Sequence, residues 1–352
     1  MAYEYSKKID RYLKAVDANR ARDLHIKTNM QPIIRVGSLL TSIDTDALTS
    51  DEIKEFVDKI TDKKQKEYFE EFHEVDISFS GAGSRFRCNA YMDMSGYNVS
   101  IRRVLLNQFD FNTLRIPEVI KTLALKKSGL ILVTGPTGSG KSTTLSSVIN
   151  YLNSTINAHI ITLEDPIECI HEPNTCLITQ REIGRDTTSY YKGLVAAMRQ
   201  DPDVIMLGEM RDLESVSTAV SAAETGHLVL STLHTKGAEN TIDRIIDMFP
   251  AGQQNQIRVQ LSMVLLGVFS QQLVPSVKDN KRVLATEIMT ATGAIKNLIR
   301  TGKTHLITST LQTARGLGMH TMDYCLQELY ENGLISQESV EMYSFDTTVS
   351  MR

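Results

Sequence analysis

The sequence predicts an α/β protein built from two domains. The chain has 352 residues, more than one ordinary hydrophobic core organises. From residue 117 onward, continuous apolar runs such as LILVTG and DVIMLGE alternate with helix-length segments, which is typical of strands buried on both faces of a sheet. Before residue 105, EVDISFS and SRFRCNAYMD instead alternate apolar with polar residues around GAG, which predicts a hairpin.

Residues 1–105 are predicted to form a small α+β domain. Residues 5–18 carry a helical apolar pattern, and the segments DLHIK and IIRVG alternate like two strands on either side of a turn. Thr49 and Glu52 have the spacing of a capping box, so we expect an amphipathic helix to begin there.

The second domain is expected to span residues 117–352. Residues 106–116 lack clear periodicity and are interpreted as a linker, after which Pro117 is expected to begin a helix. The region from about 253 is expected to be mostly helical.

Composition narrows the classes of function. The formal net charge is -4, so no general basic field indicates nucleic acid or an anionic membrane as a partner. The four cysteines are scattered without a CxxC pair, which argues against structural zinc and fits a reducing cytoplasm. The most apolar stretch, MVLLGVF, is far shorter than the roughly 20 residues that span a bilayer, so any membrane role is expected to involve a partner.

The clearest motif is a phosphate-binding loop, or P-loop. GPTGSGKS (135–142) matches GxxxxGK[ST], follows the apolar run LILVT and precedes the helical segment TTLSSVINYL. Its glycines let main-chain N–H groups face phosphate oxygens, Lys141 is expected to neutralise β/γ-phosphate charge, and Ser142 is expected to hold Mg²⁺. The residues predicted to bind the nucleotide are Gly135, Thr137, Gly138, Ser139, Gly140, Lys141, Ser142 and Thr143.

Acidic residues follow two further apolar runs. Glu209 comes after VIML, where a P-loop enzyme more often has an aspartate, and it is a candidate to deprotonate the attacking water. Glu164 comes after IITL and is a candidate to support Mg²⁺ or its water shell. Asp165 and Glu168 are weaker candidates. Acids before a proline often only form turns, so a turn role for Glu164 also stays open.

Two histidines, His227 and His234, flank the apolar run LVLSTL. Their separation of seven residues places them on opposite faces of a regular strand, so they cannot be a simple metal-binding pair. Packing histidines, or polar sensors that contact the γ-phosphate or Glu209, both remain open.

Taken in order, GPTGSGKST, TLEDPIE, AMRQDPDVIMLGEMRD and TGHLVLSTLHT resemble the motifs of the secretion ATPase superfamily, which serves type II secretion, type IV pili and type IV secretion. NTIDRIIDMFP, AIKNLIR and LGMHTMD resemble more closely the pilus retraction ATPases of the PilT type. The resemblance implies a PAS-like N-terminal domain and a RecA-like ATPase domain. It also implies ATP and Mg²⁺ as cofactors, and a homohexamer in which neighbouring subunits complete the nucleotide site.

Carried onto this sequence, the resemblance implies roles for particular residues. Glu209 is the expected catalytic glutamate and Glu164 the acid of the Asp box, while His227 and His234 form the His box. Arginines near the end of the first domain are expected to reach a nucleotide. Arg87 and Arg102 fit best, although Arg103 beside Arg102 leaves the second assignment open.

The expected function is retraction of type IV pili through an inner-membrane platform protein, from the cytoplasmic face of that membrane. Whether a sister pilus ATPase shares the platform stays open. The alternative is a PilT-like ATPase of a type IV secretion system. A more remote alternative is a nucleic-acid-translocating ring, which the net charge and the lack of a basic, aromatic-laced groove disfavour.

Overall fold

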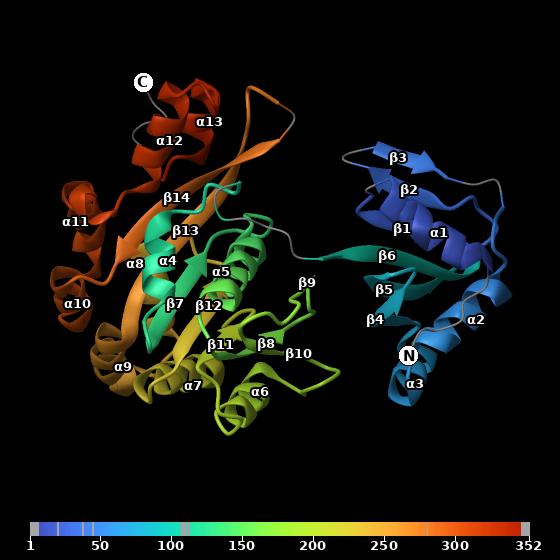
Figure 1. Ribbon diagram of the computed structural model, residues 1–352, viewed down its shortest axis with the longest axis horizontal. Coiled ribbons are helices and arrows are strands. Elements are labelled where there is room, and N and C mark those ends of the chain that lie inside the picture. Colours follow the sequence, from blue (N-terminus) through green and yellow to red (C-terminus); the bar gives the residue numbers. More distant parts are fainter. Residues whose placement is uncertain are drawn as a thin grey trace. The chain divides into compact units, whose positions relative to one another are not determined.

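The computed structural model describes residues 7–345, except for 20, 37, 38, 44, 45, 107–110, 112 and 280. The chain divides into two compact units, which are described separately (Figure 1). Unit 1 contains residues up to 106 together with 168–170, and unit 2 contains the remainder. Residues 107–110 and 112 of the expected linker lie outside the described residues.

Unit 1 is a sheet packed against helices, antiparallel except for the parallel pairing of β9 with β6. The strand order is β3-β2-β1-β6-β5-β4, and the short strand β9 pairs with the end of β6. Its elements are α1 (Lys7–Ala18), β1 (Asp23–Ile26), β2 (Ile33–Val36), β3 (Leu39–Ser42), α2 (Ser50–Ile60), α3 (Lys63–Phe72), β4 (Glu74–Gly81), β5 (Ser84–Asp93), β6 (Gly96–Leu106) and β9 (Cys169–Ile170). The predicted hairpin is confirmed, because β4 and β5 pair in antiparallel register around the GAG turn.

One face of this sheet forms a core and the other is polar. Apolar side chains of α1, α2 and α3 pack with alternate strand residues such as Leu24 and Phe86. The residues between them, including His25 and Arg87, line the opposite face. This is the period-two pattern that half-buried strands produce.

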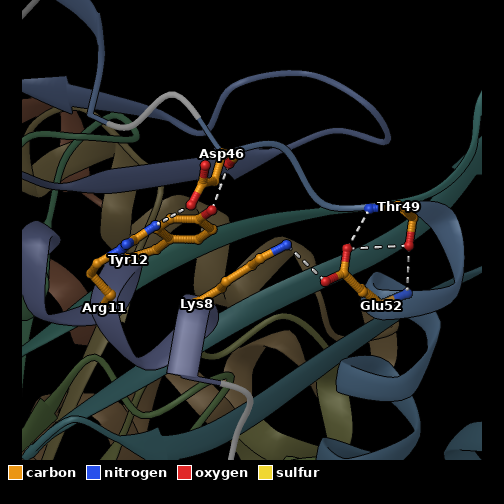
Figure 2. A network of polar contacts seen from close by, with 6 residues as sticks. All are labelled: Lys8, Arg11, Tyr12, Asp46, Thr49 and Glu52. Atoms are coloured by element: carbon orange, nitrogen blue, oxygen red, sulfur yellow. Dashed lines mark hydrogen bonds and ion pairs between the residues drawn. The ribbon is translucent and has the colours of Figure 1, made fainter.

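A polar network fixes the start of α2 against α1 (Figure 2). The predicted capping box is confirmed: the Thr49 hydroxyl accepts from the Glu52 N–H, and the Glu52 carboxylate accepts from the Thr49 N–H. Lys8 on α1 donates to the same carboxylate at 3.0 Å, and the fully buried Tyr12 donates to the carbonyl of Asp46 at 2.6 Å. The Thr49 N–H, followed by Lys8, lowers the pKa of Glu52 below its usual value.

Unit 2 is a seven-stranded sheet in the order β10-β8-β11-β12-β7-β13-β14. The pairs from β10 to β13 are parallel, and β14 is antiparallel to β13. Its strands are β7 (Gly129–Thr134), β8 (His159–Glu164), β10 (Leu177–Glu182), β11 (Val204–Leu207), β12 (Leu228–Leu233), β13 (Leu265–Pro275) and β14 (Arg282–Thr290). Its helices are α4 (Glu118–Ala124), α5 (Lys141–Thr155), α6 (Tyr190–Ala197), α7 (Leu213–Glu224), α8 (Ala238–Asp247), α9 (Ala251–Val264), α10 (Gly293–Arg300), α11 (Ile307–Thr313), α12 (Met322–Glu331) and α13 (Gln337–Tyr343), with short 3₁₀ turns at Thr304–Leu306 and Arg315–Leu317.

Helices cover both faces of this sheet (Figure 1). Along β7, Leu130 and Leu132 join the core formed with α6 to α11, whereas Ile131 and Val133 join the core formed with α4 and α5. The α/β prediction is therefore confirmed, and the continuous apolar runs are the strands that need two covered faces.

The expectation of a mostly helical region from about 253 needs correction. Helix α9 is followed by two long strands, β13 and β14, and continuous helical structure begins only at Gly293. The polar residues Gln271, Gln272 and Glu287 interrupt the apolar pattern of these strands. They are nevertheless buried, because each has hydrogen-bond partners inside the protein.

Among the residues that the structure describes, no helix combines the length and apolar character needed to cross a bilayer.

Candidate nucleotide site

The P-loop connects β7 to α5, as the sequence predicts. Gly135, Gly138 and Gly140 have φ values of +140°, +77° and +90°, which residues other than glycine rarely adopt. A Cβ added to Gly135 would lie 2.2 Å from the carbonyl oxygen of Gln271, so close packing also requires glycine there. The loop is thus held in a compact turn at the carboxyl end of β7.

The beginning of α5 provides donors for an anion. Gly140 at the N-cap position has no side chain to accept from the first-turn N–H groups, which therefore remain suited to phosphate oxygens. Lys141 is 8% exposed, and its ammonium donates to the carbonyls of Gly135 and Pro136 at 2.9 and 3.1 Å. These two hydrogen bonds hold the positive charge of Lys141 beside the P-loop.

Glu209 lies just beyond β11 and is 7% exposed. Its Oε2 lies 3.2 Å from Nε2 of His234, and its Oε1 forms an ion pair with Nε of Arg211. Sequence reasoning did not assign a role to Arg211, although it lies within the GEMRD segment. The side chains of His234 and Arg211 therefore orient the carboxylate of Glu209, the predicted catalytic group.

His234 follows β12 and links Glu209 to the P-loop. Its Nδ1 lies 3.5 Å from the hydroxyl oxygen of Thr137, while Nε2 contacts Glu209. Because β7, β11 and β12 are parallel, their carboxyl ends meet at one edge of the sheet. The structure thus brings His234, Glu209 and Thr137 together from three separate loops.

The structure does not place His227 beside Glu209 or His234 within the chain. His227 precedes β12, at the opposite end of the strand from His234, and Nδ1 contacts the carbonyl of Ala222 at 2.9 Å and the hydroxyl of Thr225 at 3.3 Å. Seven strand residues span roughly 23 Å. His227 therefore fixes the turn after α7 rather than contacting Glu209.

Glu164 ends β8 at the same edge of the sheet and is buried. Its Oε1 accepts from the Thr162 hydroxyl at 2.6 Å and from the Gln180 amide at 3.1 Å. Burial, followed by the charges of Glu209 and Asp165, raises the pKa of the nearby Tyr190 hydroxyl.

The oxygen donors on this edge suit a hard cation. The side chain of Ser142 is exposed in the first turn of α5, and Glu164 supplies a carboxylate at the end of β8, which β11 and β12 separate from β7 at the same edge of the sheet. Hydroxyl and carboxylate oxygens are the ligands that Mg²⁺ prefers, so these two residues fit the ion expected from the sequence.

The two candidate arginines lie in unit 1, on the polar face of its sheet. Arg87 and Arg102 are paired across β5 and β6, and they line a cleft of about 460 Å³. Arg87 lies 3.6 Å from Asp76, and Arg102 donates to Asp23 at 2.6 Å. Arg103 points to the other side of the strand, where it pairs with Asp17, so Arg102 is the arginine beside Arg87.

Sequence reasoning missed one buried residue that contacts the P-loop, Gln271. Its side chain hydrogen-bonds to Ser139 and Thr144. No local motif indicates this role, because the contact depends on β13 lying next to β7.

Comparison with known proteins identifies the family of this chain. The family described as type II/IV secretion system protein matches residues 71–339. The type IV pilus retraction ATPase PilT of Pseudomonas aeruginosa is 45% identical over 320 residues, which cover 91% of this chain and 93% of the relative. The twitching motility protein of Neisseria gonorrhoeae is 44% identical over 309 residues, covering 88% and 83%.

A solved structure of the pilus retraction motor PilT with bound ADP superimposes with a TM-score of 0.90 and 41% identity, covering 97% of this chain and 98% of that one. The resemblance predicted from the four sequence motifs is therefore confirmed. The chain belongs to the type II/IV secretion system protein family.

Proposed function

We propose that this chain is an ATP-hydrolysing motor that drives type IV pilus retraction and twitching motility. The observation that carries the proposal is the series of side-chain contacts from Thr137 of the P-loop through His234 to Glu209. It joins a phosphate-binding turn to a buried carboxylate, which are the two parts that hydrolysis of a nucleoside triphosphate needs. The named relatives, a pilus retraction ATPase and a twitching motility protein, support retraction as the work performed.

In the proposed reaction, main-chain N–H groups of the P-loop and the Lys141 ammonium bind the phosphates of ATP. Ser142, and Glu164 through water, hold Mg²⁺, which when bound neutralises phosphate charge. These residues position the γ-phosphate in front of the end of β11.

Glu209 then accepts a proton from the attacking water. The water oxygen bonds to the γ-phosphorus while the bond to the bridging oxygen of ADP breaks, and ADP and phosphate result. His234 orients Glu209, and its contact with Thr137 makes that orientation depend on the P-loop.

The remaining part of the site is proposed to come from another copy of the chain. Transition-state charge on the phosphoryl group is stabilised best by cations that arrive as the site closes. Arg87 and Arg102 stand side by side on an accessible sheet face and supply two guanidinium groups. Their arrival would couple hydrolysis to motion between copies.

The proposed assembly is a homohexamer that acts on an inner-membrane platform protein from the cytoplasmic face. The combination of a sheet edge that binds phosphate and a separate arginine face supports an assembly of copies, because each copy then both holds a nucleotide and completes a neighbour's site. A shared platform with a sister pilus ATPase is compatible with this arrangement.

The first test is hydrolysis and assembly by the purified full chain. The wild-type chain should hydrolyse ATP in the presence of Mg²⁺, and Glu209→Gln with ATP should have a solution mass six times the 39.4 kDa chain. A monomer that binds ATP without assembling would contradict the ring.

The biological role is tested by deleting the gene. Excess pili that do not retract are the expected phenotype. Lost secretion with normal pili would instead favour the secretion ATPase role, which the family description also covers.

A further inference from the structure

Strand β13 runs beside β7 and continues along the P-loop. The last residue of β7, Thr134, pairs with Ser270, so the next residues, Gly135 and Gln271, also lie side by side. The main-chain carbonyl of Gln271 occupies the space where a Cβ of Gly135 would be. A residue more than a hundred positions away in sequence therefore packs directly against the start of the loop.

The Gln271 side chain reaches two further points of the loop and helix. It is 1% exposed; its Nε2 donates to the carbonyl of Ser139 at 2.8 Å, and its Oε1 accepts from the Thr144 hydroxyl at 3.0 Å. Nε2 also lies 3.3 Å from the position that a Cβ of Gly140 would occupy. One amide thus spans the last turn of the P-loop and the first turn of α5, with both of its polar ends bonded.

This geometry has a consequence for the phosphate-binding face of the loop. The carbonyl of Ser139 and the N–H of Gly140 belong to one planar peptide group and point in opposite directions. Because Gln271 holds that carbonyl on the β13 side, it holds the Gly140 N–H on the side away from β13. A loop that loses this bond can rotate the peptide and turn the N–H away from a phosphate oxygen.

We propose that Gln271 is a positioning residue that orients the peptide between Ser139 and Gly140 for binding of the nucleotide β- and γ-phosphates. The inference rests on the proposed function, since it assigns the P-loop to a nucleotide. Gln271 acts through the loop backbone and through Thr144, and it is distinct from the groups that react.

The neighbouring residue Gln272 provides a matched control. It is 7% exposed, and its Nε2 donates to the carbonyl of Tyr343 at 2.9 Å, in the C-terminal part of unit 2. The same substitution at the two positions therefore removes a buried amide in each case. Only the substitution at Gln271 removes contacts to the P-loop.

The experiment measures ADP affinity by calorimetry and the KM and kcat of ATP hydrolysis, using full-length Gln271→Leu, Gln272→Leu and wild-type chains. Both variants should melt earlier than wild type, because each leaves buried polar groups without partners. Only Gln271→Leu should bind ADP more weakly and show a raised KM, by roughly tenfold for a lost buried hydrogen bond that orients a donor to a charged group.

Two milder variants separate orientation from general destabilisation. Thr144→Val removes one of the two bonds and should weaken ADP binding less than Gln271→Leu does. Gln271→Glu keeps the acceptor for Thr144 and can donate to Ser139 only when protonated, so its ADP affinity relative to wild type should recover as the pH is lowered. Gln271→Leu should show no such recovery.

The outcomes distinguish this inference from the proposed function. If the wild-type chain neither binds ADP nor hydrolyses ATP, the proposed function fails. If the wild type is active while Gln271→Leu and Gln272→Leu have equal ADP affinities, the positioning role alone is overturned. If Gln271→Leu does not fold, an ADP affinity of Gln271→Glu that stays in constant ratio to wild type at every pH overturns it equally.

Discussion

The polar groups of unit 2 and those of unit 1 are held in different ways. In unit 2, Lys141 and Glu209 are buried at a sheet edge and joined to the P-loop or to His234 by hydrogen bonds. In unit 1, Arg87 and Arg102 stand on an open sheet face, with side chains 42% and 53% exposed.

This difference indicates which groups are fixed and which are exchangeable. Both partners of the Arg87–Asp76 pair are exposed, and exposed ion pairs contribute at most about 1 kcal/mol, so a phosphate can replace Asp76 beside Arg87 at little cost. The guanidinium of Arg102 is also exposed, although its partner Asp23 is buried. Buried groups are costly to rearrange, so Glu209 and Lys141 are expected to keep their positions through the reaction. Catalytic groups held in place in unit 2, and arginines that can exchange partners in unit 1, suit a site that is completed when copies of the chain assemble.

The largest expected effect is at Glu209. Glu209→Gln keeps the size of the side chain but removes its basicity, so kcat for ATP hydrolysis should fall by at least roughly 100-fold while ADP affinity is retained. Steady-state turnover and calorimetry on the same preparation measure the two quantities. Turnover close to wild type would show that another group activates the water.

Lys141→Ala should act on binding. Removal of the ammonium that lies across Gly135 and Pro136 is expected to weaken ADP binding by roughly 10- to 100-fold, as for lost hydrogen bonds to a charged group. Titration calorimetry gives the ADP affinity, and an unchanged value would show that Lys141 of the P-loop does not bind the nucleotide.

The two histidines offer a comparison along a single strand. His234→Ala should lower kcat by roughly five- to tenfold, the value of one orienting hydrogen bond, with little change in melting temperature. His227→Ala should change the melting temperature and leave kcat within about twofold, because its contacts are to Ala222 and Thr225. Equal kcat losses in both variants would restore the expectation of a shared role.

The smallest expected effect lies in unit 1. Thr49→Ala removes the capping box of α2 and should cost about 1 kcal/mol of unfolding free energy. Chemical denaturation followed by circular dichroism measures this loss, and ADP affinity should not change. A weaker ADP affinity would show that the stability of unit 1 influences binding at the P-loop.

Much of the fold and of the phosphate site could be predicted from local patterns. Parallel strands place their carboxyl ends at one edge, so the glycine-rich loop and Glu209 were expected to lie there. For His234, contact with Glu209 was one of the two alternatives left open. Arg211 was missed because its ion pair with Glu209 depends on how the loop after β11 folds.

Other features depended on the order of strands, which no local pattern specifies. The contact of Gln271 with the P-loop arises because β13 inserts between β7 and β14. The polar residues Gln271 and Gln272 interrupt the apolar pattern of β13, so this segment was not predicted to be a strand. His227 was placed with His234 because motif order was used, whereas a strand of six residues separates the two ends physically.

We propose that hydrolysis needs Glu209 of one copy together with Arg87 and Arg102 of another. The most direct test co-assembles inactive Glu209→Gln chains with inactive chains carrying Arg87→Ala and Arg102→Ala, and measures ATP turnover. Mixed assemblies contain some sites in which both parts are wild type, so turnover should rise well above that of either variant alone. Turnover equal to the average of the two separate variants would contradict the claim, because it would place the arginines and the glutamate in the same chain's site.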